Sequence, residues 1–570
     1  MVFEGKRLDS VIVILLGIIL YAIAYWGYVK WFDRNVVMAD PKRETPAHTY
    51  MDGVEFFPSN RYVLFGFQWK SIAALGPVTG PIIALQWGWL PGLLWILFGT
   101  IFIGWIHDYG SLVVSARHEG ASFGPITYEL ISPRARTILL WYMLWYIILI
   151  LVGFCNIVAT QVFPAYPVSP VPVLIVAIVG IVVGYATYKL KVNIVYTTII
   201  AVIIMFLGIW AGMALPYSVP LPAAGAFPIA RDFWIFMTLL FCFLGAVLPI
   251  WVFIQPINYL SFYLVYAGII GMIIGAFVGA PNYQVSMTTV FYDLSKAASG
   301  PLWPMMFVTI ACGAISGWHS LIGSSVSSKQ LDTEPDAHFI GGGAMLAEGI
   351  LALVSLTAVA ILTPASVAGK LPADKFVIGG STLLGYLGIP TNVGTALAAV
   401  MVIILAITIM HIGLRITRLV LSDLSGPRFG GVFKNKYVSA IIVCIIVYIL
   451  TSPHTGAAFI YIWGTFGGAN QLMAGLALMI VSLWLTREKR PTVYTVIPML
   501  FMLATTLSAL TYLAYDGLWN PVTGYLKTLT VGTLFAVCVN IFLLILGLFM
   551  CYEGIKAFKR LRAKPKEKTA

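Results

Sequence analysis

Three ionisable side chains stand inside long apolar stretches of the sequence. Asp108 follows the stretch FIGWIH, His319 lies in ISGWHSLIG, and Glu348 lies in GGGAMLAEGILAL. An ionisable group inside an apolar helix is energetically expensive and generally faces a partner or a water-filled cavity. A carboxylate suits a sodium ion, whereas a carboxylate or histidine that changes charge carries a proton. These residue types favour ion coupling or gating, against the alternatives of a structural ion pair or a helix-end cap.

Counting residues along the expected helices places these three groups at one depth. The helices span 91–116, 303–325 and 340–363, and each group lies roughly 9 to 12 Å inside the inner boundary at about 1.5 Å per residue. One depth predicts one polar layer, to which Ser324 and Ser325 add hydroxyl oxygens that suit sodium. For the histidine, a satisfied structural role is an equal alternative. The predicted ion-coupling layer comprises Asp108, His319, Ser324, Ser325 and Glu348.

The segment 67–88 contains two Gly-Pro pairs near its middle, Gly76-Pro77 and Gly80-Pro81. Proline removes a backbone donor and glycine permits unwinding, so a broken helix is expected near residues 76–81. Transporters use such breaks to bind substrates and coupling ions, because irregular backbone at membrane depth must line a cavity or pack on protein. The alternative is a kinked helix that serves packing only.

Other polar side chains extend this predicted substrate site. Asn470 and Gln471 can donate and accept hydrogen bonds, although amides commonly join helices, which is the leading alternative. Lys70 is interpreted as an interfacial lysine that snorkels. His107 and Asp108 are expected to point to different helix faces, which argues against an intramembrane enzyme. The predicted substrate site comprises Gly76, Pro77, Gly80, Pro81, Gln86, Asn470 and Gln471.

Transmembrane helices must position these residues, because the composition leaves no water-soluble alternative. The chain has 570 residues, of which 60% are hydrophobic and 10% charged, and its mean hydropathy is +0.93. Apolar runs of about 20 residues, long enough to cross a bilayer, recur along the chain. The sequence predicts an all-α polytopic membrane protein with about fifteen transmembrane helices. Their expected limits are 10–29, 67–88, 91–116, 136–162, 171–188, 192–214, 233–254, 259–279, 303–325, 340–363, 391–414, 437–451, 457–485, 492–514 and 526–552.

The 34 lysines and arginines set the expected orientation. With the N-terminus outside and the C-terminus in the cytoplasm, 26 of them fall in inner loops and the tail, as the positive-inside rule requires. The net charge of +12 therefore indicates orientation in the cell membrane and lipid contact rather than a nucleic-acid partner. The six cysteines lie in apolar runs without metal-type spacing, so no metal, disulfide or cofactor is expected.

Five stretches within residues 63–479 stand out when they are taken together and in order. They are VLFGFQWKSIAALGPVTGPIIALQWGWLPG, HDYGSLVVSARHEGASFG, FVTIACGAISGWHSLIGSSVSSKQL, DAHFIGGGAMLAEG and WGTFGGANQLMAGLALM. As a set they resemble the carbon starvation protein A family of peptide and pyruvate transporters. The family motif, placed on this sequence, points to Gly76, Pro77, Gly80, His319, Ser324 and Ser325.

The resemblance implies an inverted five-plus-five repeat of the amino acid, polyamine and organocation transporter type. The broken segment would be the first helix of the first repeat, and the segment at 303–325 the third helix of the second. The implied regions are an extra helix and cytoplasmic loop at 1–66, repeats at 67–214 and 233–414, four peripheral helices at 437–552 and a basic cytoplasmic tail at 553–570.

These observations favour a secondary active transporter that imports small peptides or a small carboxylate such as pyruvate, driven by protons or sodium. No nucleotide-binding P-loop is present in the sequence, which disfavours direct coupling to ATP. The alternatives are a channel or nutrient sensor of the same fold and, less favoured, an intramembrane enzyme. The expected partners are the solute and membrane lipid.

Overall fold

The structure is a computed structural model that describes residues 10–219, 229–280, 299–425, 431–452, 459–520, 525–526 and 530–563. The described chain is helical except for loops and one short antiparallel pair, β1 (Trp519–Asn520) with β2 (Tyr525–Leu526). The first half comprises α1 (Ser10–Ile23), η1 (Ala24–Val29), α2 (Lys30–Phe32), η2 (Asp33–Val37), α3 (Pro46–Thr49), α4 (Arg61–Ile72), α5 (Gly76–Ala84), η3 (Leu85–Trp87), α6 (Trp89–Gly99), η4 (Thr100–Gly104), α7 (Trp105–Ala116), α8 (Phe123–Leu130), α9 (Pro133–Asn156), η5 (Ile157–Val162), α10 (Phe163–Ala165), α11 (Pro170–Tyr188) and α12 (Ile194–Ala214).

The second half is equally helical. It comprises α13 (Ile229–Val247), α14 (Ile254–Gly279), η7 (Leu302–Met306), α15 (Phe307–Thr309), α16 (Gly317–Ser325), η8 (Ser327–Lys329), η9 (Glu334–Asp336), η10 (His338–Gly343), α17 (Ala344–Ala360), η11 (Pro364–Val367), α18 (Pro372–Gly385), α19 (Thr391–Leu424), α21 (Lys436–Thr451), α22 (Phe459–Arg487), α23 (Val493–Leu518) and α24 (Val531–Ala563).

Local signals explain where several helices begin. The hydroxyl of Ser132 precedes Pro133 of α9 and accepts a hydrogen bond from the backbone nitrogen of Ala135 at 3.1 Å. Asn60 and Asn193 cap α4 and α12 in the same way, at 2.9 and 2.8 Å. Each cap satisfies a backbone N–H that no carbonyl within the helix can reach.

Eleven helical stretches of the described residues are long and apolar enough to cross a membrane, and α21 is a shorter apolar helix. The protein is therefore an all-α polytopic membrane protein. Each of the fifteen predicted segments contains helix, but this criterion yields eleven spans, so the predicted number is not confirmed.

Two predicted segments are interrupted. The segment 67–88 is divided into α4 and α5 by residues 73–75, so the break precedes both Gly-Pro pairs, and Pro81 lies inside α5. The segment 303–325 is divided into α15 and α16 by residues 310–316. The prediction of one continuous helix there is wrong.

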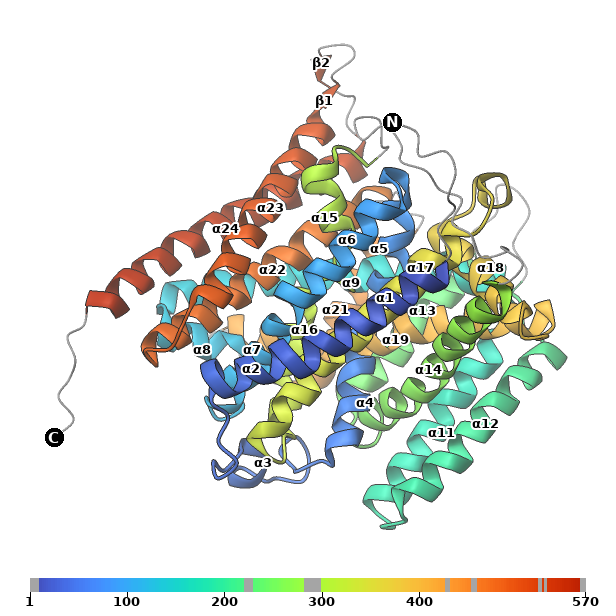
Figure 1. Ribbon diagram of the computed structural model, residues 1–570, viewed down its shortest axis with the longest axis horizontal. Coiled ribbons are helices and arrows are strands. Elements are labelled where there is room, and N and C mark those ends of the chain that lie inside the picture. The colour runs from blue at the N-terminus through green and yellow to red at the C-terminus, as the bar shows by residue number, and fades with distance from the viewer. Residues whose placement is uncertain are drawn as a thin grey trace.

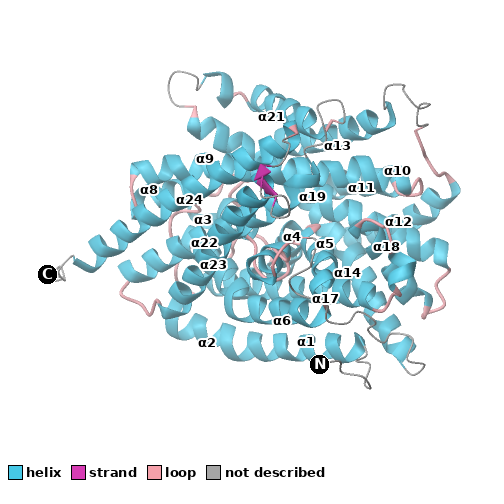
Figure 2. Cartoon of the chain, turned by 90° about the horizontal axis from the view of Figure 1, so that it is seen from above, coloured by secondary structure: helices cyan, strands magenta, loops and turns pink. Residues whose placement is uncertain are grey.

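The long helices run side by side in one bundle (Figure 1). α22 lies in its interior against α9, α16, α23 and α24, whereas α11 and α12 pair at one edge and keep exposed outer faces (Figure 2). The start of α1 and the end of α24 lie at opposite ends of the bundle (Figure 1). We refer to these two ends as the α1 end and the α24 end.

Candidate functional site

The two interrupted helices pack against each other at a contact that leaves no space for side chains. A Cβ atom on Gly76 would lie 2.5 Å from Cβ of Cys312, and one on Gly80 would lie 2.6 Å from the carbonyl oxygen of Thr309. Gly313 has a φ of +85°, a backbone conformation that favours glycine. The glycines of the Gly-Pro pairs therefore allow α5 to approach the stretch 310–316.

Side chains from other helices bind the carbonyl groups that this second break releases. The Nε2 atom of Gln471 donates to the carbonyl oxygens of Phe307 and Ile310 at 2.7 and 3.1 Å. The indole nitrogen of Trp95 donates to the same two oxygens at 3.1 and 3.3 Å. Because a buried carbonyl without a donor is destabilising, these side chains support the interruption.

Asn470 joins three helices around the same break. Its Oδ1 accepts hydrogen bonds from the hydroxyls of Tyr146 and Ser316 at 2.5 and 3.0 Å. The same oxygen accepts from the backbone nitrogen of Trp318 at 3.1 Å, and Nδ2 donates to Sγ of Cys312 at 3.5 Å. In this structure both predicted amides hold helices together.

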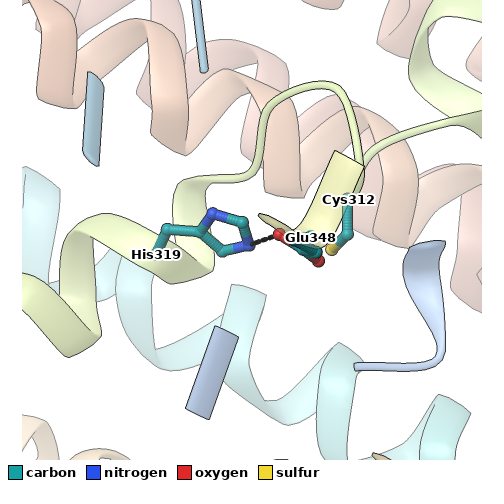
Figure 3. Close-up of side chains that lie close together, drawn as sticks. All are labelled: Cys312, His319 and Glu348. Carbon is teal, nitrogen blue, oxygen red and sulfur yellow. Dashed lines mark ion pairs between the residues drawn. The ribbon is translucent and has the colours of Figure 1, made fainter. Parts of the chain in front are cut away.

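Four ionisable side chains lie in a row in the interior of the protein. We call them the central cluster: His107, Asp108, His319 and Glu348. Nδ1 of His107 lies 2.7 Å from Oδ1 of Asp108, whose Oδ2 lies 2.8 Å from Nδ1 of His319. Nε2 of His319 points toward Glu348, 3.1 Å from its Oε2 (Figure 3). All four residues are at most 1% exposed. The three ionisable groups expected at one depth are thus in contact, whereas the expectation that His107 and Asp108 point apart is wrong.

Lys70 is completely buried, so its interpretation as a snorkelling interfacial lysine is wrong. Its Nζ donates to the carbonyl oxygen of Ala73, in the first break, at 3.2 Å. It also donates to the hydroxyl of Thr408 in α19 at 2.5 Å. The ammonium group therefore binds a carbonyl released where α4 ends.

The remaining predicted site residues lie away from the central cluster. The hydroxyl of Ser324 is buried without a hydrogen-bond partner among the described residues. Ser325 lines a small cavity with Glu55 and Arg415. Gln86 bonds to the side chain and backbone nitrogen of Ser299 at 2.8 and 3.0 Å. Among the described residues, the Ser324 hydroxyl makes no hydrogen bond to the central cluster.

A cavity of about 700 Å³ opens between the helices at the α1 end. Thr79 and Ile83 of α5 line it, together with Thr309 at the end of α15. Gly76 and Gly80 of α5 face the other interrupted helix, and their neighbours Thr79 and Ile83 line this cavity. The other described lining residues include Gln161, Met305, Trp463, Tyr512, Asp516 and Asn540.

Ion pairs tie the loop before α4 to the helices at the α24 end. Glu55, in the loop before α4, bonds to Lys329 at 2.9 Å and to Arg415 of α19 at 3.2 Å. Burial alone would raise the pKa of Glu55, but the two cations outweigh burial and hold that pKa below its usual value. Arg117 pairs with buried Glu334 beside the same loop. Sequence reasoning missed these pairs, since charged loop residues carry no spacing signal for their partners.

The fold and these contacts are those of a multi-pass membrane protein in which two interrupted helices meet beside a buried ionisable cluster. The chain belongs to the family described as Carbon starvation protein CstA, whose model matches residues 9–373 and 364–509. The resemblance seen in the sequence is thereby confirmed.

Named relatives place this family among transporters. The chain is 34% identical over 372 residues to the Pyruvate/proton symporter BtsT of Escherichia coli strain K12, a match that covers 63% of this chain and half the length of that relative. It is 27% identical to the Peptide transporter CstA of Bacillus subtilis strain 168, over 98% of both chains. A solved manganese transporter of Eremococcus coleocola is 12% identical at a TM-score of 0.49, covering 90% of this chain and 99% of that one, a similarity that carries no argument about function.

Proposed function

We propose that this chain is a secondary active transporter that takes up small peptides or a small carboxylate such as pyruvate, driven by a proton gradient. Family membership and the names of the relatives support transport, and the symporter among them supports the proton. The two inverted repeats over 67–214 and 233–414, implied by the resemblance, are part of this proposal.

The observation that carries the proposal is the combination of an open cavity at one end with ion pairs at the other. The cavity of about 700 Å³ reaches Thr79 and Thr309 on the two interrupted helices. The Glu55 pairs close the opposite end. Transporters place their solute sites at interrupted helices and open one end at a time. In this proposal the α1 end faces outside and the α24 end faces the cytoplasm.

Uptake by the purified chain in proteoliposomes tests this function. Labelled pyruvate and a labelled dipeptide are offered with an imposed proton gradient, with a sodium gradient, or with neither. We expect uphill accumulation of one solute class with the proton gradient, its loss on adding a protonophore, and counterflow in the absence of any gradient. Liposomes without protein are the control.

The alternatives have distinct outcomes in the same assay. A channel would equilibrate the solute without accumulating it, and a sensor would bind it without moving it. Solute accumulation that requires the sodium gradient and not the proton gradient would show that sodium is the coupling ion.

A further inference from the structure

Three potential metal-binding atoms converge beside the second break. They are Sγ of Cys312, Nε2 of His319 and a carboxylate oxygen of Glu348, and all lie within 4.8 Å of one another. Cys312 lies in the stretch 310–316, whereas the histidine and the glutamate come from α16 and α17 (Figure 3). Thiolate, imidazole and carboxylate are the three side-chain types that bind zinc in proteins.

The carboxylate in this group is buried without a hydrogen bond from the described residues. Glu348 is completely buried, and neither of its side-chain oxygens has a hydrogen-bond partner among the described residues. His319 is also completely buried, and its Nε2 lies 3.1 Å from Glu348 without forming a hydrogen bond. Buried polar groups normally have a partner, so these atoms point to a ligand that satisfies them together.

Hydrogen bonds from neighbouring residues already orient the side chains of His319 and Cys312. Nδ1 of His319 lies 2.8 Å from Oδ2 of Asp108, a contact that leaves Nε2 as the lone-pair atom. Metal-bound histidines usually donate their other ring N–H to a carboxylate in this way. Sγ of Cys312 accepts from Nδ2 of Asn470 at 3.5 Å and donates to the hydroxyl of Ser316 at 3.2 Å, so two polar groups orient the sulfur.

We propose that Cys312, His319 and Glu348 bind a divalent transition-metal ion of the zinc class. The metal replaces the thiol proton on binding, and the proton leaves to solvent. One thiolate, one carboxylate and a divalent cation form a neutral unit, which suits the apolar interior of a membrane. The thiolate selects against sodium, magnesium, calcium and manganese, whose preferred ligands are oxygen atoms.

The ion ties the interrupted stretch to two neighbouring helices. Cys312 sits on the non-helical stretch 310–316, and the other two ligands sit on α16 and α17. Because α5 packs directly on Cys312, a metal at this position fixes the contact between the two breaks. The proposal does not depend on the identity of the transported solute.

Metal analysis of the purified full chain tests the proposal. We expect about one zinc per chain by mass spectrometry, and binding of Co²⁺ to metal-stripped protein with a sulfur-to-cobalt charge-transfer band. Cys312→Ser should abolish that band, and Glu348→Gln should weaken Co²⁺ binding by at least tenfold. Cys155→Ser is the matched control, because Cys155 is equally buried and lies outside the group.

Folding of each variant is verified by its elution as a single species in detergent. A folded wild-type chain that binds neither zinc nor Co²⁺ overturns the proposal. A cobalt band that persists in Cys312→Ser also overturns it, since the metal would then be adventitious. In either case Asp108, His319 and Glu348 would keep the role expected from the sequence, which is ion coupling. Asp108→Asn or His319→Gln would then remove the pH dependence of uptake.

Discussion

In the proposed transport cycle, closure of the α24 end depends on Glu55. It brings the loop before α4 onto Lys329 and Arg415, two cations that lie in different elements. Hydrogen bonds to charged groups contribute roughly 1.5 to 3 kcal/mol each at favourable sites. Loss of this one carboxylate therefore releases two attachments of the loop.

We expect Glu55→Gln to raise the opening of this end by about tenfold, which corresponds to about 1.4 kcal/mol. The measurement is the alkylation rate of a cysteine introduced at Ser325, which lines the cavity beneath Glu55, in a cysteine-free background. Glu44→Gln, an exposed change in the preceding loop, before α3, should leave the rate unchanged. Equal rates in both variants would show that the pairs do not hold the loop.

The pH dependence of this attachment follows from the lowered pKa of Glu55. A carboxylate whose pKa falls on folding contributes stability above its unfolded pKa, about 4.3, and loses it as pH falls through its folded pKa. The difference in thermal unfolding between wild type and Glu55→Gln should therefore persist from pH 8 to pH 5 and shrink only below about pH 4. If the difference in thermal unfolding disappears by pH 6, a group other than the Glu55 carboxylate provides the stabilisation.

At the residue scale, part of the site could be predicted because an ionisable side chain is energetically unfavourable inside an apolar helix unless it has a partner. Asp108, His319 and Glu348 were expected in one layer because each interrupts an apolar run, and they are in contact. Cys312 was interpreted as an apolar packing residue, since cysteine spacing showed no metal pattern. The three residues proposed to bind a metal come from three separate elements, an arrangement that leaves no such pattern in a sequence.

At the scale of elements, the contact between α5 and the second break depends on the missing side chain of Gly80. A Cβ there would lie 2.6 Å from a backbone carbonyl oxygen, which cannot move aside as a flexible side chain can. A single methyl group is therefore enough to separate the two interrupted helices.

We expect Gly80→Ala to reduce uptake by at least tenfold while membrane insertion and yield stay normal. Gly385→Ala is the matched control, because nothing lies within 4 Å of a Cβ at that helical position. Uptake is measured in proteoliposomes with equal amounts of each protein. Wild-type rates for Gly80→Ala would refute a functional contact between the two breaks.

The first break could be predicted and the second could not. Gly-Pro pairs marked the segment 67–88, although the actual break lies just before them. The stretch 310–316 lacks proline, and its glycines were equally well explained by helix packing. Its support comes from Trp95 and Gln471, residues distant in sequence whose amide and indole groups bind the released carbonyls.

For the whole molecule, the positions of the helix ends make orientation testable. α1 begins and α24 ends at opposite ends of the bundle (Figure 1). The distribution of lysine and arginine predicts the α1 end outside.

In a cysteine-free background, a cysteine near position 4 should react with an impermeant thiol reagent in intact cells. One near position 568 should react only after the cells are opened. Removal of the native cysteines ensures that only the introduced thiol reacts. The reverse labelling pattern would show that the N-terminus is in the cytoplasm, and the proposed orientation would be wrong.

The length of α19 links the closed end to the thickness of the surrounding bilayer. Its uncharged stretch 391–414 is about 36 Å long at about 1.5 Å per residue, against roughly 30 Å of hydrocarbon. A helix of this length can match the membrane by tilting together with the helices packed around it, and a change in tilt would move Arg415, directly after that stretch, relative to Glu55. We expect reconstitution in lipids of short, medium and long acyl chains to change the uptake rate, with Glu55→Gln reducing this dependence. Such a dependence would make bilayer thickness a mechanical input to this end of the bundle.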